Sequence, residues 1–162
     1  MKNKIIIIVL SWLMVLATML IIYSFSGETA TESSETSGGF IKLILELFLP
    51  DEKITDELVS KFQHPVRKIA HFTIFALLGF CFANAFNHTF NIKSLYKNLF
   101  SFVSSVLYAS FDEFHQSFVA NRGPSFKDVI IDSVGALTGV LLHLLMIYLI
   151  ALIKQKKQKR HQ

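Results

Sequence analysis

The sequence predicts an all-α integral membrane protein, a four-helix bundle with a short amphipathic or interfacial helical segment between its first and second spans. Of the 162 residues, 52% are hydrophobic, and they are gathered in blocks rather than spread along the chain. A helix needs about 20 mostly apolar residues to cross a bilayer. Blocks of about that length place the predicted spans at residues 5–25, 69–86, 95–111 and 129–153. Because these spans take up most of the chain, we expect a single domain, 1–162, without a separate soluble catalytic domain.

The first predicted span follows Lys2 and Lys4 and contains Trp12. A secretory signal peptide opens in the same way, but its apolar core is usually about 7–15 residues long. The apolar run over 5–25 is longer, which favours a span that is retained in the protein. Residues 24–27 would nevertheless serve as a cleavage site, so both alternatives stand.

The segment 26–68 is expected to form an external loop that is only partly helical. Residues 26–39 are rich in Ser, Thr, Glu and Gly without apolar periodicity, which predicts a flexible loop. Residues 40–49 are strongly apolar but would reach only about half way across a bilayer, so they predict an interfacial or re-entrant helix. Residues 51–63 carry apolar side chains at helical spacing and predict a short amphipathic helix.

The later spans carry polar and small residues that indicate helix-to-helix contacts. Pro65 stands near the first turn of the second span, where its missing N–H costs little. The fourth span carries one stripe of residues that advance by four, three and four positions: Asp128, Asp132, Gly135 and Gly139. The two glycines form a GxxxG pattern, which lets helix backbones approach closely. We therefore expect the glycines to pack inside the bundle and the aspartates to point inward.

The net charge of +4 does not indicate a nucleic-acid partner, because of where the charges lie. Five Lys and Arg residues lie in the basic tail 154–162, directly after the last span, as a juxtamembrane cluster does. No aromatic residue interleaves with them and no nucleic-acid motif is present. The expected partner is instead the lipid bilayer.

The distribution of Lys and Arg predicts the orientation. With four spans, the N-terminus, the loop 87–98 and the tail lie on one side of the membrane. These segments hold nine Lys and Arg residues against seven on the other side, where eight acidic residues of 26–68 also lie. This asymmetry predicts a multi-pass protein of the cell membrane with both termini cytoplasmic.

Ionisable residues gather where the third and fourth spans meet. Residues 121–124 predict a turn, and ionisable groups at membrane depth are by default a functional-site hypothesis. Glu113 and Gln116 are three residues apart and share a helix face. The candidate cluster includes the basic residues and the histidine at the start of the second span. Its members are Arg67, Lys68, His71, Glu113, Gln116, Arg122, Asp128 and Asp132.

This cluster permits three interpretations. Its basic residues could grip the phosphate or carboxylate of an amphiphilic envelope molecule. Glu113 with His71 could act as base and acid, or histidines and carboxylates could hold a metal. Alternatively, Glu113 and Asp128 pair with Arg122 and Lys68 and hold the hairpin together.

Catalysis receives the least support from sequence motifs. No HExxH-like pair and no GxSxG elbow is present, and a single cysteine excludes a cysteine metal site. We therefore assign no catalytic residue and predict no metal and no cofactor. Binding or a structural role is favoured over an enzyme.

Two stretches of the chain resemble the VanZ-like family of bacterial membrane proteins. The first matches that family's Lys-x-x-His-Phe-x-x-Tyr-x-x-Leu-Gly pattern at Lys68, His71, Phe72, Leu78 and Gly79. The second matches its Asp-Glu-x-x-Gln, Arg, Asp and Asn-x-x-Gly series at Asp112, Glu113, Gln116, Arg122, Asp128, Asp132 and Gly135. Residues 23–26 also resemble the serine-bearing end of the family's first span. Two positions depart from the pattern, since Phe75 replaces the usual Tyr and Asp132 the usual Asn.

The resemblance implies a four-helix membrane protein of the bacterial cell envelope. The family's founding member is associated with teicoplanin resistance in Gram-positive bacteria. We therefore expect a protein that binds an amphiphilic envelope ligand at the outer face, or alters access to it. A lipoglycopeptide antibiotic or a lipid-linked precursor would be such a ligand. The alternative is a membrane-embedded acid–base or metal-assisted enzyme that acts on a lipid-linked cell-wall substrate.

Overall fold

The computed structural model describes residues 2–48, 54–120 and 123–159, and over these ranges the chain forms helices and no strand. The elements are α1 (Lys2–Ser26), α2 (Ala30–Phe48), α3 (Asp56–Thr89), α4 (Ser94–Gln116) and α5 (Phe126–Lys159). The prediction of an all-α chain is confirmed. The predicted count of four bundle helices does not match, because the segment between the first two spans forms a full helix, α2.

Helix α2 begins inside the stretch 26–39 that was predicted as a flexible loop, so that prediction was wrong. Its start is a capping box, in which the Thr29 backbone N–H and hydroxyl both donate to a Glu32 carboxylate oxygen at 2.8 Å. The Glu32 N–H donates back to the Thr29 hydroxyl at 3.3 Å. The bonds from Thr29 hold the pKa of Glu32 below its ordinary value. The interfacial helix predicted at 40–49 is therefore only the second half of α2.

Helix α3 is the centre of the molecule and contacts each of the other four helices. Thr55 caps its start by accepting the Leu58 N–H at 3.3 Å. The short helix predicted at 51–63 and the span predicted at 69–86 are joined in α3, so Pro65 lies in the helix interior rather than in its first turn. At about 1.5 Å per residue α3 is about 51 Å long, which exceeds the roughly 30 Å of a hydrocarbon core.

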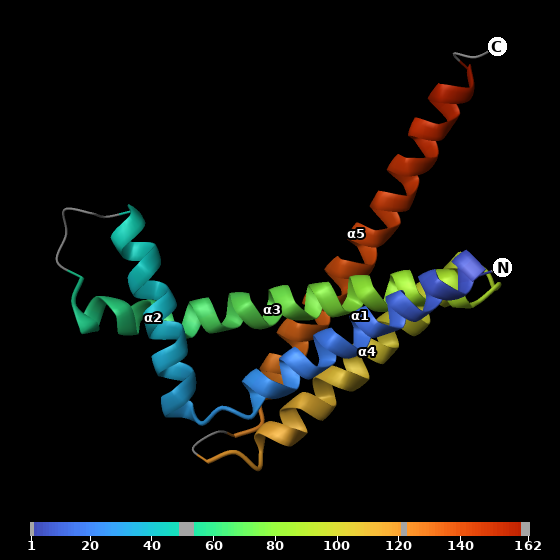
Figure 1. The fold of residues 1–162 in the computed structure, drawn as a ribbon. Coiled ribbons are helices and arrows are strands. Elements are labelled where there is room, and N and C mark those ends of the chain that lie inside the picture. The colour runs from blue at the N-terminus through green and yellow to red at the C-terminus, as the bar shows by residue number, and fades with distance from the viewer. Residues whose placement is uncertain (1, 49–53, 121–122, 160–162) are drawn as a thin grey trace.

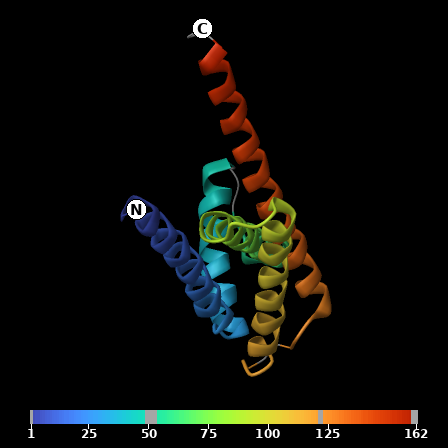
Figure 2. The same ribbon diagram turned by 90° about the vertical axis from the view of Figure 1, so that its right-hand side faces the viewer.

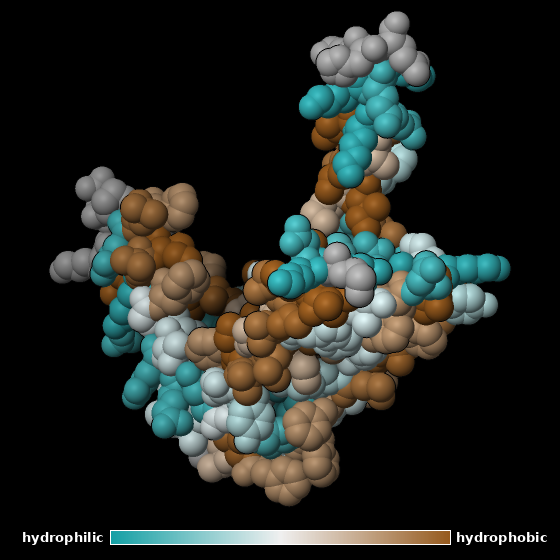
Figure 3. Space-filling view, turned by 45° about the vertical axis from the view of Figure 1, so that its right-hand side comes forward, coloured by the Kyte–Doolittle hydropathy of each residue, from teal (hydrophilic) through white to brown (hydrophobic). Residues whose placement is uncertain are grey.

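The other helices are arranged around α3, with α1 and α4 packed against it and α5 crossing it (Figures 1 and 2). The first half of α5 packs against α3 and α4, and its last buried residue is His143. Beyond His143, α5 projects away from the other helices (Figure 1). Figure 3 shows this projecting part changing from apolar to hydrophilic toward its end, where the basic residues lie.

Three helices, α1, α3 and α5, are long and apolar enough to cross a membrane. Their outward surfaces carry exposed Ile, Leu, Val and Phe side chains, as lipid contact requires. The third predicted span, 95–111, corresponds to α4, which does not meet the same criterion among the described helices. Its buried face explains the difference, because most of that face consists of polar residues: Ser101, Ser105, Asp112, Glu113 and Gln116.

Helices α3 and α5 approach each other most closely at three glycines. A Cβ added at Gly135 or Gly139 of α5 would overlap a backbone carbonyl of α3, and one added at Gly79 of α3 would overlap a carbonyl of α5. Gly135 lies against the residue that follows His71 and is three positions from Asp132. This contact therefore sets the height of His71 relative to Asp132.

Candidate functional site

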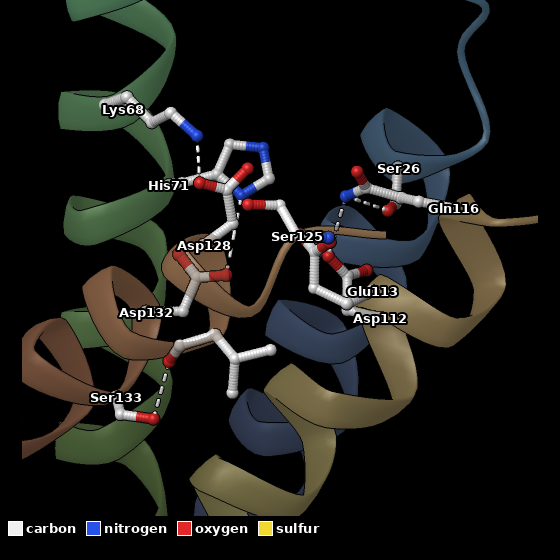
Figure 4. Close-up of polar contacts among 11 residues, drawn as sticks. Ser26, Lys68, His71, Asp112, Glu113, Gln116, Ser125, Asp128, Asp132 and Ser133 are labelled. Carbon is white, nitrogen blue, oxygen red and sulfur yellow. Dashed lines mark hydrogen bonds and ion pairs between the residues drawn. The ribbon is translucent and has the colours of Figure 1, made fainter. Parts of the chain in front are cut away.

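Most of the predicted cluster lines one small cavity at the end of the bundle where α4 ends and α5 begins. Measured as the space open to the centre of a water molecule, the cavity holds about 20 Å³, which is room for one water. Figure 4 shows the polar side chains converging on this region from α3, α4 and α5. The lining residues are His64, Arg67, Lys68, His71, Gln116, Asp128, Ile131 and Asp132.

Two facing pairs connect α3 to α5 across this cavity. Lys68 forms an ion pair with Asp128, and both side chains are partly exposed. One turn further along each helix, His71 faces Asp132, with 3.7 Å between His71 Nδ1 and Asp132 Oδ2 (Figure 4). That separation is too long for a hydrogen bond. Lys68 and Asp128 are therefore in direct contact, whereas His71 and Asp132 lie within ion-pair distance without a hydrogen bond.

Asp132 is the most buried carboxylate of the site. Its side chain is 0% exposed, and neither carboxylate oxygen has a hydrogen-bond partner within the described part of the chain. Within the same ranges, His71 Nδ1 also has no partner. Buried polar groups are nearly always hydrogen-bonded in native structures, so this unsatisfied pair requires an explanation.

Glu113 lies beside the cavity and contacts the start of α5. Its Oε2 accepts the Ser125 N–H at 2.8 Å. The Ser125 carbonyl in turn accepts the N–H groups of Asp128 at 2.9 Å and Val129 at 3.3 Å. Ser125 therefore lies directly before α5 and accepts bonds from its first turn. Glu113 makes no ion pair with a described basic residue, and Arg122, one of its two predicted partners, lies outside the described residues. Glu113 instead ties the end of α4 to the beginning of α5.

Asp112 and Ser26 belong to the site but were absent from the predicted cluster. Gln116 Nε2 donates to Ser26 Oγ at 2.8 Å and to Asp112 Oδ2 at 3.1 Å (Figure 4). Asp112 lies four positions before Gln116, and this spacing on one helix face could have included it. The sequence signal for Ser26 was the serine-bearing end of the first span. That signal does not indicate that Ser26 contacts Gln116 of α4.

Two predicted residues, Arg67 and Arg122, remain to be placed, together with one α4 histidine that was not in the predicted cluster. Arg67 lines the cavity, is half-buried, and makes no ion pair with any residue that the structure describes. His115 lies away from the cavity, with its ring 4.5 Å from that of Tyr23. Arg122 was predicted to belong to the cluster but lies outside the described residues.

The fold and the site together define a membrane protein whose helices enclose a cluster of carboxylate, histidine and amide side chains at one end of the bundle. The family model described as VanZ/LLP1 matches residues 10–151, a range that includes every residue of the site. The chain therefore belongs to the VanZ/LLP1 family, and the VanZ-like resemblance is confirmed. Comparisons with curated proteins and with solved structures give no match.

Proposed function

We propose that this protein binds the anionic headgroup of an amphiphilic cell-envelope molecule at the cavity end of its helix bundle. The observation that carries the proposal is Arg67, which lines the cavity without a carboxylate partner among the described residues. A guanidinium group binds phosphate or carboxylate through two parallel hydrogen bonds. Lys68 is already paired with Asp128, so among the described Lys and Arg residues that line the cavity, Arg67 is the one that remains for a ligand.

The surroundings of the cavity favour a ligand that has an apolar part. The cavity has room for only about one water, so nearly all of the ligand has to lie outside it. Phe114, Phe118 and Phe126 flank this end of α4 and α5 and are 61%, 74% and 79% exposed. Aromatic side chains are enriched at membrane–water interfaces. A lipoglycopeptide antibiotic or a lipid-linked wall precursor offers both an anionic group and a lipid tail.

The proposed location is the outer face of the cell membrane, with both termini in the cytoplasm. The Lys and Arg asymmetry of the sequence supports this orientation, since the segment 154–162, which includes the last turns of α5, is strongly basic. A lipid-tailed drug partitions into the outer leaflet, where the cavity would then be reached from the interface. Expression in a susceptible Gram-positive host should therefore raise tolerance to teicoplanin more than tolerance to vancomycin.

Direct binding gives the sharper test. The full chain in nanodiscs is titrated with teicoplanin and, separately, with a polyprenyl pyrophosphate, and the same measurement is made on Arg67→Gln. Hydrogen bonds to charged groups contribute about 1.5–3 kcal/mol, so Arg67→Gln should weaken binding by about 10- to 100-fold. Lys61→Gln is the matched control, because Lys61 is an exposed cation of the same helix paired with Glu57. Equal affinity in Arg67→Gln, or no binding of either probe, would refute the proposal.

An enzyme acting on a lipid-linked cell-wall substrate is the second candidate. The observation that favours it is the grouping of His71, Asp112 and Asp132, whose potential ligand or proton-transfer atoms lie within 4.8 Å of one another. Such groups contribute about 10²- to 10⁴-fold in rate as general acids and bases. Incubation of the protein with the polyprenyl pyrophosphate and analysis by mass spectrometry would reveal turnover. Binding without any product would support the binding function and count against the enzyme.

A further inference from the structure

Within the described part of the chain, the Asp132 carboxylate has no hydrogen-bond partner. It is fully buried on α5, and neither oxygen accepts a hydrogen bond from the described residues. Burying a carboxylate without compensation is strongly unfavourable. The His71 Nδ1 atom lies 3.7 Å away and donates no hydrogen bond to it. A cation placed between these two groups would satisfy both.

We propose that His71, Asp112 and Asp132 bind a divalent transition-metal cation. One potential ligand atom from each residue lies within 4.8 Å of those from the other two. Ligands about 2.1 Å from a tetrahedral metal ion are roughly 3.4 Å apart, so the widest pair has to close by at most about 1.4 Å. The separation of 3.7 Å between His71 Nδ1 and Asp132 Oδ2 is already within about 0.3 Å of that value.

The three ligands come from three different helices and are held from outside the group. Asp112, 2% exposed, is oriented by the Gln116 amide, which donates to its Oδ2 at 3.1 Å. Hydrogen bonds of this kind to ligating carboxylates fix their orientation and tune the metal. The close glycine contact between α3 and α5 sets the position of His71 against Asp132. The site is thus largely formed by the fold itself.

Charge and donor type indicate the class of ion. Asp112 and Asp132 are both buried, and a divalent ion would neutralise two carboxylates that otherwise repel each other. One imidazole nitrogen with two carboxylate oxygens suits zinc or manganese better than calcium, which prefers oxygen ligands alone. Three protein ligands leave a coordination position open, and the adjoining cavity has room for one water there. This inference goes beyond headgroup binding, which needs no metal.

The test uses the full chain in detergent, with any affinity tag removed, stripped with EDTA and then titrated with Zn²⁺ or Co²⁺. The wild-type protein should bind one ion per chain, with a visible Co²⁺ spectrum typical of nitrogen and oxygen ligands. Asp132→Asn should weaken binding by at least about 100-fold, more than changes to outer-shell groups do. Asp128→Asn is the matched control, because Asp128 lines the same cavity one turn away but is paired with Lys68. It should bind the metal like the wild type.

Melting temperature gives a second readout that separates a metal site from a purely structural carboxylate. Zn²⁺ should raise the melting temperature of the wild type but not that of Asp132→Asn. In EDTA the wild type should melt at a lower temperature than Asp132→Asn, because the Asn variant no longer buries a carboxylate that lacks a hydrogen bond. If Asp132→Asn yields no monodisperse protein, Asp112→Asn replaces it and should show the same loss of metal affinity. The proposal would be overturned if the wild type bound no stoichiometric metal. It would also be overturned if Asp132→Asn bound the metal as tightly as the control Asp128→Asn.

Discussion

Substitution of Gly139 by Ala tests the close contact between α3 and α5 with one added methyl group. The new Cβ would overlap the Ala76 carbonyl oxygen and lie 2.8 Å from the Phe80 nitrogen. Both are backbone atoms, so no side-chain rotation can relieve the overlap. The two helices have to move apart, and the cavity that lies at one end of their contact has to change with them.

The magnitude follows from two opposing effects. Overpacking a well-packed contact typically costs about 1–3 kcal/mol, and a clash with backbone belongs at the upper end of that range. Replacing a helical glycine by alanine recovers up to about 1 kcal/mol of helix propensity. The net loss in the free energy of unfolding should be about 2 kcal/mol. For a chain of this size that lowers the melting temperature by about 4–8 °C.

The assay can use the chain's own cysteine. Cys81 is the only cysteine and is 1% exposed in α3, so a thiol-reactive fluorescent dye reports when the bundle opens. Gly39→Ala is the matched control, because a Cβ at this α2 glycine meets nothing within 4 Å. That variant should melt at the same temperature as the wild type or slightly higher. If Gly139→Ala also melts higher, α3 and α5 do not pack through this glycine as described.

Three further outcomes follow from the structure. Glu113→Gln keeps an acceptor for the Ser125 N–H and should lower stability by less than about 1 kcal/mol, whereas Glu113→Ala should cost about 1–3 kcal/mol; equal losses in thermal melts would argue against this bond. Gly123→Cys in a Cys81→Ser background should label with an impermeant maleimide in intact cells, and labelling only after permeabilisation would reverse the proposed orientation. Tyr108→Phe removes a partly buried donor to a backbone carbonyl of α1 at 2.6 Å, so its melting midpoint should fall by an amount equivalent to about 1 kcal/mol. An unchanged midpoint would contradict that contact.

The positions of the helices could be predicted because apolar run length relates directly to the thickness of a bilayer. Their ends could not, since these depend on a few local bonds. The capping box of Thr29 and Glu32 reads as low-complexity polar sequence unless the four-residue pattern is sought. Pro65 suggested a helix start, yet α3 continues through it because packing against the other helices compensates for one missing bond.

The membership of the site could be predicted in large part, but not its pairings. Charged side chains within apolar surroundings are conspicuous in a sequence, and this identified Lys68, His71, Asp128 and Asp132. Which of them meet depends on the register between α3 and α5, and the glycine of α3 that fixes this register, Gly79, gives no sign of its partner. Asp112 was missed because adjacent residues differ by about 100° on a helix. Only the packed structure shows that both it and Glu113 are buried.

The division of the site among helices also bears on how the protein is made. Asp128 and Asp132 both belong to α5, which leaves the ribosome after α1, α2, α3 and α4. Until it arrives, Lys68 has no counter-charge on α5, and α4 carries its polar face into the membrane region without the helix against which that face packs. The polar groups of α3 and α4 are therefore paired and packed within the membrane only once α5 has been made. A chain arrested after α4 should be recognised and degraded by membrane proteases rather than accumulate as a stable partial bundle.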